Sequence, residues 1–556
     1  MNSARVPDRV PRLQDVFWGR IPIPLTGATS HFLVAGATGS GKTLLLDCLM
    51  YTALHHRELN PAWRFIVYDP KLDAIPKLTD MLRGFEPVIL NPLDSRSKVW
   101  NIHADIDSPS AAREFASILA PDEPKSENPF FTSAVQDLIS GVAVSLSRRI
   151  AEGYHWSFRD LLWILFNTGE ESGLRDFERL VGGQPETRRL LDYFQVPETA
   201  FNIRATIMAK LTRYEPVAAA WHHRARSNPE RLFSLKSWTK DRPLGGAQDI
   251  DYETLSRHVA VIGIDETSRS AVDAVNRAMF VRLSQLLLSS PDVHQGPGFG
   301  SGPLTWVFLD EVREAGNLEG LHRLLNKGRS KGVAAAIGFQ DIQGLRDAYG
   351  TLRADEMIGQ CATIAVLRLR SPETAEWASR LFGDFYVTAE SDNESFGSSI
   401  SIGRGRAIER RRKILDSDLY NLPSTSPKNG LTGYFECPFV PGMDDPAGFD
   451  PKLHVSWDDL GWRNAKSALE KGADLDNVMG TGAGPDWRIN VYGQKEVPAE
   501  EQVMPPFDDY DRKALSLGAE GHIIHKPKTV PRQGSSGNES LPSIPIRDRG
   551  KRGHSQ

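Results

Sequence analysis

A glycine-rich segment near the N-terminus carries the clearest chemical signal in the chain. An apolar run at residues 32–35 leads into Gly-Ala-Thr-Gly-Ser-Gly-Lys-Thr at residues 36–43, and a leucine-rich stretch follows. The pattern predicts a strand, a loop and a helix whose backbone N–H groups and positive dipole end face a phosphate. We expect Lys42 to reach the β- and γ-phosphates of ATP and the Thr43 hydroxyl to bind Mg²⁺. The expected loop contacts come from Gly36, Ala37, Thr38, Gly39, Ser40, Gly41, Lys42 and Thr43.

An acidic pair follows an apolar run much later in the sequence. Residues 304–309 read as a buried strand, and Asp310 and Glu311 come directly after it. Ligands of open α/β sheets bind at the carboxyl ends of the strands. Asp310 is therefore expected to hold the Mg²⁺ shell, and Glu311 to polarise the attacking water. The alternative is that the two acids are a solvated strand end.

Two further residues are candidates for catalysis. Gln340 follows a small-residue strand at 333–339, and Arg329 ends the preceding helix, 318–328. An amide at the position of Gln340 can sense a γ-phosphate, and an arginine at the position of Arg329 can reach the site of a neighbouring subunit. A helix-capping amide and a surface arginine are the alternatives.

Composition limits the class of protein. The chain has 556 residues, 40% hydrophobic and 25% charged, and a formal net charge of -5. This charge argues against nucleic-acid coating along the whole chain, so any DNA contact needs a local basic surface. Its three cysteines are widely spaced, which favours reduced, structural thiols in the cytoplasm. The sequence shows no apolar run of about 18 residues and no signal-peptide pattern.

Alternating strand and helix patterns predict an α/β fold with a central, mostly parallel sheet. From about residue 108 the pattern becomes helix after helix, which predicts an inserted all-α domain. The predicted parts are a first part of the nucleotide-binding domain at 1–107, the all-α domain at 108–238, the second part of the nucleotide-binding domain at 239–441, a C-terminal extension at 442–519 and a disordered basic tail at 520–556.

A basic run follows a serine-rich stretch at residues 388–402. A solvated face is one interpretation and a phosphate-contacting surface is the other. The run contains Arg404, Arg406, Arg410, Arg411, Arg412 and Lys413.

Several ordered motifs together resemble the type IV secretion coupling proteins, the TraD/TraG class of conjugative ATPases related to the FtsK and HerA translocases. The chain carries Asp-Pro-Lys at 69–71, an Asn-Pro-Leu-Asp motif at 91–94, Phe-Leu-Asp-Glu at 308–311 and Pro-Glu-Thr-Ala-Glu-Trp at 372–377. These motifs are similar to family segments in family order across most of residues 15–435. Family members usually begin with two transmembrane helices, and this sequence has none.

The resemblance implies a RecA-like P-loop ATPase that assembles as a ring, translocates single- or double-stranded DNA, and uses ATP and Mg²⁺. It implies that relaxase or secretion-channel proteins are partners and that any membrane contact is made through a partner subunit. The expected location is the cytoplasm, peripheral at the inner membrane. Two alternatives stay open: a HerA/FtsK-like translocase or helicase without a secretion role, and a nucleotide-gated adaptor for protein substrates.

Overall fold

The computed structural model describes a large part of the chain. Residues 1–517 form one compact unit and residues 518–556 a second. The predicted basic tail at 520–556 lies outside the described residues. Those residues are 15–55, 63–70, 73–123, 128–149, 154–183, 185–240, 251–292, 305–396, 400–439, 452–456 and 496–515.

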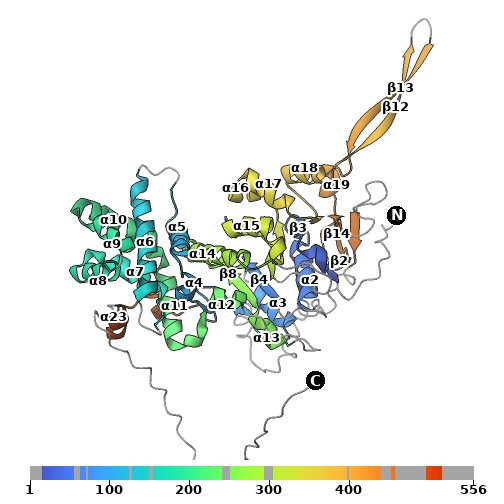
Figure 1. Ribbon diagram of the computed structural model, residues 1–556. Helices are drawn as coiled ribbons and strands as arrows, with labels where there is room; N and C mark the ends of the chain where they lie inside the picture. Colours follow the sequence, from blue (N-terminus) through green and yellow to red (C-terminus); the bar gives the residue numbers. More distant parts are fainter. Residues whose placement is uncertain are drawn as a thin grey trace, which may run out of the picture. The chain divides into compact units, whose positions relative to one another are not determined.

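A nine-stranded sheet forms the centre of the first unit (Figure 1). Its order is β15-β14-β11-β3-β10-β9-β4-β8-β5, and the seven strands from β11 to β5 run parallel. The prediction of an α/β fold with a mostly parallel sheet is confirmed. The strands are β3 (Phe32–Ala35), β4 (Arg64–Asp69), β5 (Val88–Ile89), β8 (Val259–Gly263), β9 (Thr305–Leu309), β10 (Val333–Phe339), β11 (Thr363–Val366), β14 (Leu431–Glu436) and β15 (Lys452–Val455).

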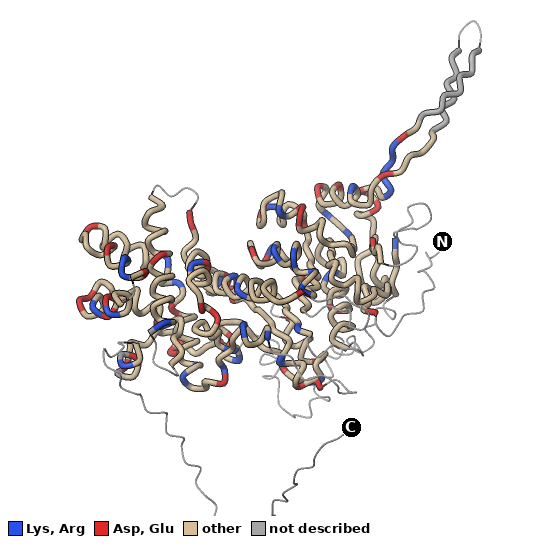
Figure 2. Tube along the Cα trace, viewed as in Figure 1, with Lys and Arg blue, Asp and Glu red and all other residues tan. Residues whose placement is uncertain are grey.

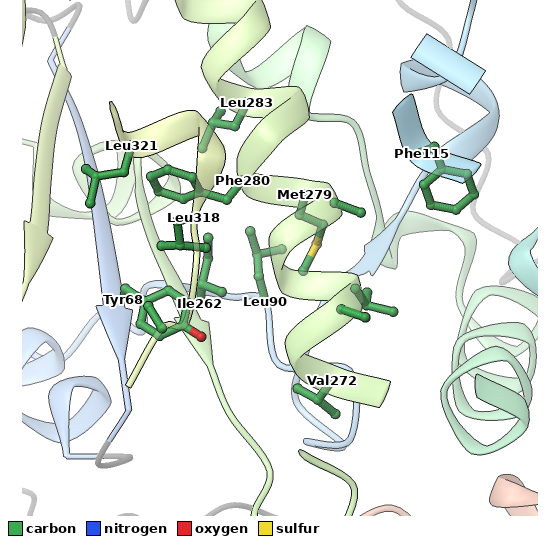
Figure 3. Packing of buried hydrophobic residues seen from close by; sticks show 14 of the residues in the cluster. Tyr68, Leu90, Phe115, Ile262, Val272, Met279, Phe280, Leu283, Leu318 and Leu321 are labelled. Atoms are coloured by element: carbon green, nitrogen blue, oxygen red, sulfur yellow. The ribbon is translucent and has the colours of Figure 1, made fainter. Parts of the chain in front are cut away.

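The two faces of the sheet bury alternate residues of each strand, because side chains along a strand point to opposite sides. On one face, Phe32 and Phe65 pack with helices α2 (Lys42–Leu54) and α3 (Ala74–Met81). On the other face, Tyr68 and Ile262 pack with helices α14 (Arg269–Leu288) and α15 (Glu319–Lys327) (Figure 3). The strands read as continuous apolar runs because both faces are covered.

The helical insertion begins and ends at one small strand pair. Strand β6 (Val99–Trp100) pairs in parallel with β7 (Leu232–Phe233), so the two ends of the insertion lie together. Asp105 fixes this junction, accepting hydrogen bonds from Trp100 Nε1 at 2.7 Å and the Leu235 amide at 2.8 Å. The insertion contains α4 (Ile102–Asp105), α5 (Pro109–Leu119), α6 (Pro129–Arg149), α7 (Phe158–Phe166), α8 (Glu171–Val181), α9 (Pro185–Arg188), α10 (Pro197–Leu211), α11 (Glu215–Ser227) and α12 (Leu235–Lys240).

Helix α6 is the one helix among the described residues that is long and apolar enough to cross a membrane by length and composition alone. Half of its apolar window is buried, and Leu138, Val142 and Leu146 belong to the main hydrophobic core. Burial of this kind is typical of the core helix of a globular protein. The sequence analysis counted no such stretch because serine, threonine and glycine interrupt the helix.

A long antiparallel hairpin leaves the sheet domain between α18 (Pro372–Leu381) and α19 (Asp416–Tyr420) (Figure 1). Its strands are β12 (Asp384–Phe396) and β13 (Ile400–Arg412). The serine-rich stretch and the basic run therefore lie on paired strands, which the sequence analysis did not predict. Polar and glycine-containing strands give no buried alternation to recognise.

Ordered structure continues past residue 441, into the predicted C-terminal extension. Strand β15 pairs with β14 at the sheet edge. Residues 496–515, with α23 (Asp509–Leu515), pack on the helical insertion, where Val497 and Leu515 join the main core. The finer domain boundaries stay predictions.

Candidate nucleotide site at the carboxyl edge of the sheet

The glycine-rich loop lies between the end of β3 and the start of α2. Its backbone is held by both neighbouring strands, since the Gly36 amide donates to Phe339 O at 3.2 Å and the Ala37 amide to Arg368 O at 2.8 Å. The Lys42 ammonium donates to Gly36 O at 2.9 Å, across the loop. Gly41 precedes α2 with φ 98°, a conformation that glycine adopts without strain. The loop is therefore an anchored cradle at a helix N-terminus.

Thr43 and Asp310 meet at this edge although they are far apart in the sequence. The Thr43 hydroxyl donates to Asp310 Oδ2 at 2.7 Å. The contact forms because β10 lies between β3 and β9, so the carboxyl ends of all three strands share one edge. A hydroxyl and a carboxylate are hard oxygen ligands of the kind that Mg²⁺ prefers.

Glu311 follows Asp310 at the end of β9 and is only 5% exposed. The amide of the next residue, Val312, donates to Gly338 O at 2.9 Å, which holds this turn against β10. A Cβ at Gly338 would lie 2.5 Å from Asp310 O, so the backbone approaches closely here. The acidic pair is thus fixed in place by the two central strands.

Gln340 lies at the rim of the loop. The Thr38 hydroxyl donates to Gln340 Oε1 at 3.0 Å, and the Gln340 side chain is exposed. The alternative interpretation, a cap for the following helix, does not fit: Asp341 is the N-cap of α16 (Ile342–Tyr349) and accepts from the Gln343 amide at 3.1 Å. The structure therefore places this amide beside the nucleotide loop.

Arg329 lies at the other end of the same strand. It begins the short helix η5 (Arg329–Lys331), directly before β10, and it is exposed. The length of β10 separates Arg329 from Gln340. Within one chain the structure does not bring Arg329 to the loop.

The sequence analysis missed a segment that supports the loop from outside. The Thr425 hydroxyl donates to Ser40 O at 2.6 Å, and the Thr425 amide donates to Gly39 O at 3.3 Å. Arg368 hydrogen-bonds to the neighbouring Ser424 hydroxyl. No spacing in the sequence points to this segment, because serine and threonine are common in turns and the contact joins residues almost 400 positions apart.

The sequence analysis also missed Asp47 as a residue near the site, although its spacing from Thr43 could have indicated it. It lies four residues after Thr43, on the same face of α2. Its carboxylate pairs with Lys77 Nζ at 3.3 Å. Burial raises the pKa of Asp47 to about 6, the Lys77 charge opposes this shift, and the Asp310 charge adds to it. An ionised Asp47 would increase the negative potential behind the Thr43–Asp310 pair.

The residues present fit a Mg²⁺–nucleotide. Among the described residues no cluster of three or more His, Cys, Asp or Glu side chains has the arrangement of a protein-built metal cage. Mg²⁺ in nucleotide sites is usually held by one or two protein ligands, phosphate oxygens and water. Thr43, Asp310 and the cradle at the start of α2 supply this set.

The profile of the family described as the type IV secretion-system coupling protein DNA-binding domain matches residues 15–438. The chain belongs to this family. The expected resemblance is confirmed, and it covers the sheet up to β14, the helical insertion and the hairpin.

Curated relatives share shorter segments. The conjugal transfer protein TraG of Agrobacterium fabrum is 30% identical over 122 residues, 22% of this chain and 18% of the relative. The DNA translocase FtsK of Treponema pallidum is 34% identical over 64 residues, 12% of this chain and 8% of the relative. These matches span less than a fifth of the relatives' length.

Solved structures of the bacterial conjugative coupling protein TrwB share the fold. The unbound form has a TM-score of 0.55 at 23% identity, covering 81% of this chain and 89% of TrwB. The complex of TrwB with ADP and Mg²⁺ also has a TM-score of 0.55 at 23% identity, covering 81% and 90%. At this identity the similarity shows the fold.

Proposed function

We propose that this coupling-family chain is an ATP-hydrolysing motor that translocates DNA and delivers it, with attached relaxase, to a type IV secretion apparatus. The observation that carries the proposal is the 2.7 Å contact between the Thr43 hydroxyl and the Asp310 carboxylate beside an anchored phosphate loop. Two motifs separated by 267 positions meet here, and together they supply the groups that a Mg²⁺–ATP complex needs.

The roles follow from the positions. The loop amides of residues 36–43 and Lys42 bind phosphate oxygens, and bound Mg²⁺ neutralises charge that develops on them. Thr43 and Asp310 hold the ion. Glu311, buried beside Asp310, orients and polarises the attacking water. Gln340 responds to the γ-phosphate through its place at the rim, next to Thr38.

A ring assembly accounts for Arg329. Because this residue lies at the opposite end of β10 from its own loop, it acts only if it reaches the site of a neighbouring subunit. Hydrolysis per chain should then rise with protein concentration. Full activity in a strictly monomeric protein would contradict the role of Arg329 in a neighbouring site.

The cellular setting is part of the same proposal. The motor works in the cytoplasm at the inner membrane, with relaxase or channel proteins as partners and membrane contact through a partner subunit. A HerA/FtsK-like translocase without a secretion role is the second candidate, supported by the segment similar to FtsK. Capture of relaxase by the full chain favours the coupling role, and DNA-stimulated turnover without such capture favours the second candidate. A nucleotide-gated adaptor predicts capture of protein substrates and no stimulation by DNA.

The decisive experiment measures phosphate release by the full chain with and without single- and double-stranded DNA. Lys42→Ala should abolish turnover, a loss of at least about 100-fold, because the loop then lacks the cation that contacts the transferred phosphate. Lys210→Ala removes a lysine from the helical insertion, where it pairs with Glu123, and is the matched control. Unchanged turnover in Lys42→Ala, with an unchanged melting temperature, would refute the ATPase. Absence of stimulation by either DNA would refute the DNA motor.

A further inference from the structure

The base of the β12–β13 hairpin carries charge that the nucleotide site does not use. Residues 380–388 and 408–413 contain five cationic side chains and two carboxylates, and Arg380 also pairs with Glu376. The local formal charge is therefore +2, in a chain with a net charge of -5. Figure 2 shows Lys and Arg positions gathered where the hairpin joins the sheet domain. An electrostatic contact with a polyanion has to use such a local surface.

One face of this base is concave. A cavity of about 650 Å³ is lined by Arg380, Gly383, Asp384, Tyr386, Arg410 and Arg412. This size lies within the range of about 300–1,000 Å³ typical of sites for small molecules or parts of larger ligands. We call this surface the hairpin basic face.

Strand pairing explains why these residues share a face. Tyr386 pairs with Arg410. Asp384 pairs with Arg412, and this second pair lies two residues from the first on each strand. Residues two apart on a strand point to the same side, so all four side chains lie together. Arg411, between the two arginines, points to the other side and does not line the cavity.

A single carboxylate orients two of the arginines without cancelling their charge. Asp384 is 17% exposed and forms ion pairs with Arg410 and, at 3.7 Å, with Arg412 Nε. The Arg410 side chain is nevertheless 70% exposed, so its guanidinium keeps donors available to a ligand. This arrangement preorganises a cationic surface.

Tyr386 gives the face its second property. It is 73% exposed, which is high for an aromatic residue on a strand, and its cross-strand partner is Arg410. An exposed aromatic ring next to arginines is typical of proteins that stack a base and contact the adjacent phosphates of a single strand. A lipid surface would require several apolar side chains at one depth, and the described part of this face exposes only two large hydrophobic residues, Tyr386 and Ile408.

We infer that the hairpin basic face binds single-stranded DNA, with Arg380, Arg410 and Arg412 on the phosphodiester backbone and Tyr386 stacked on a base. This inference rests on the proposed function, because it names one surface that holds the translocated strand. The surface is separate from the nucleotide loop, so its residues are expected to leave basal hydrolysis unchanged.

The test measures binding of a fluorescein-labelled oligothymidylate to the full chain by anisotropy at several salt concentrations. Arg410→Gln should weaken binding about 3- to 10-fold and lower the salt slope by roughly 0.7, the contribution of one phosphate contact to a single strand. Arg411→Gln is the matched control, since it removes the same charge one residue away on the opposite face. Arg411→Gln should change binding less than 2-fold, roughly the long-range contribution of a screened charge. Equal losses in the two variants would overturn the inference.

Tyr386 supplies a second and independent arm. Tyr386→Ala should weaken binding by roughly 5- to 100-fold, the range found when an aromatic stacking partner is removed. Tyr386→Phe keeps the ring and should bind like the unaltered chain, and melting temperatures confirm that both variants are folded. Unchanged binding by Tyr386→Ala would refute the site.

Two controls separate this inference from the proposed function. If the unaltered chain does not bind the oligothymidylate but double-stranded DNA still stimulates hydrolysis, only the hairpin inference fails. If the chain binds and the hairpin variants bind equally well, only the hairpin site is refuted. If neither DNA is bound and neither stimulates hydrolysis, both proposals fail. Vesicles of phosphatidylcholine with about a quarter phosphatidylserine test the other polyanion. Loss of vesicle binding in Arg410→Gln with intact DNA binding would overturn the inference in favour of a membrane surface.

Discussion

The carboxyl edge of the sheet and the helical insertion each join residues that are far apart in the sequence, but they do so by different means. At the sheet edge, backbone pairing of β3, β10 and β9 brings Thr43 to Asp310, 267 positions away. In the insertion, a side-chain ion pair joins Arg159 Nη2 on α7 to Asp511 Oδ2 on α23 at 2.7 Å, across 352 positions.

The second contact depends on complete burial. The side chains of Arg159 and Asp511 are both 1% exposed, and Arg159 also pairs with Asp160 at 3.0 Å. His222 accepts from the same guanidinium at 3.1 Å. Buried charges are held only when each has a partner, so removing one leaves another uncompensated. The sheet edge distributes its stability over many backbone hydrogen bonds, whereas the docked C-terminal segment concentrates it in a few polar groups.

The largest effect that tests this difference is expected for Asp511→Ala. We expect a loss of about 3–5 kcal/mol in the stability of the docked segment, because Arg159 stays buried with one carboxylate fewer. The measurement is the free energy of local opening of residues 496–515 by hydrogen exchange, together with urea unfolding. Asp508→Asn is the matched control. It removes the charge that pairs with Arg226 on a side chain that is 46% exposed, but keeps the oxygen that accepts from the Asp511 amide at 2.8 Å, so it should cost about 1 kcal/mol or less. Similar losses in the two variants would show that burial of the pair is unimportant.

At the sheet edge the expected effects come from the backbone and are smaller. A Cβ at Gly41 would lie 2.7 Å from Thr425 Oγ1 and 2.8 Å from Leu431 Cδ1, at φ 98°. Gly41→Ala should therefore destabilise the fold by about 2–3 kcal/mol, through backbone strain and a clash with the segment that supports the loop.

Gly39→Ala separates the two causes. Gly39 has φ 73°, and no atom lies within 4 Å of an added Cβ. This variant should cost only the backbone strain, about 1 kcal/mol. Urea unfolding of both variants measures the difference, and equal costs would remove the argument that Thr425 and Leu431 press on the loop.

Much of the sheet was predictable because its elements carry local patterns. The buried strands are continuous apolar runs, and parallel order places their carboxyl ends together, so the relation of Lys42 and Thr43 to Asp310 followed from the residues on each side. The position of Gln340 next to the loop was expected for the same reason, since it follows the carboxyl end of β10. The insertion was predictable as an all-α region because apolar residues recur there at three- and four-residue spacing.

The docked C-terminal segment, the hairpin and the Thr425 contact could not be predicted, because the residues that form them follow no periodic pattern in the sequence. The segment at 496–515 docks through Arg159 and a few apolar residues, and such pairs have no sequence spacing to recognise. The described ends of the hairpin strands expose even their hydrophobic residues, Phe385, Tyr386 and Ile408, so no buried alternation identified them. Thr425 contacts the loop through one hydroxyl, which looks like any turn residue in the sequence.

A pH-dependent effect concerns two histidines, one at the amino end of β3 in the sheet and one in the helical insertion. His31, at the start of β3, uses one ring nitrogen on Leu325 O at 3.0 Å and accepts from the Ala335 amide at 3.1 Å with the other. Burial lowers the pKa of His31 to about 4, and burial and the Arg159 charge lower the pKa of His222 to about 4.

Because both folded pKa values lie below the ordinary value near 6.5, the unfolded chain binds protons first as the pH falls. Stability should therefore be constant above about pH 6.5 and decrease between about pH 6.5 and 4, by roughly 1–2 kcal/mol for each histidine, with the value for the partly exposed His222 reduced by solvent screening. Hydrogen exchange at residues 333–339 and at 496–515 assigns the loss to a region. His31→Gln should flatten the pH dependence only in the first segment and His222→Gln only in the second, with His223→Gln as the control next to His222. If either variant flattened both segments, the two regions would unfold as one unit, and the contrast between backbone pairing and a buried ion pair would not extend to their stability.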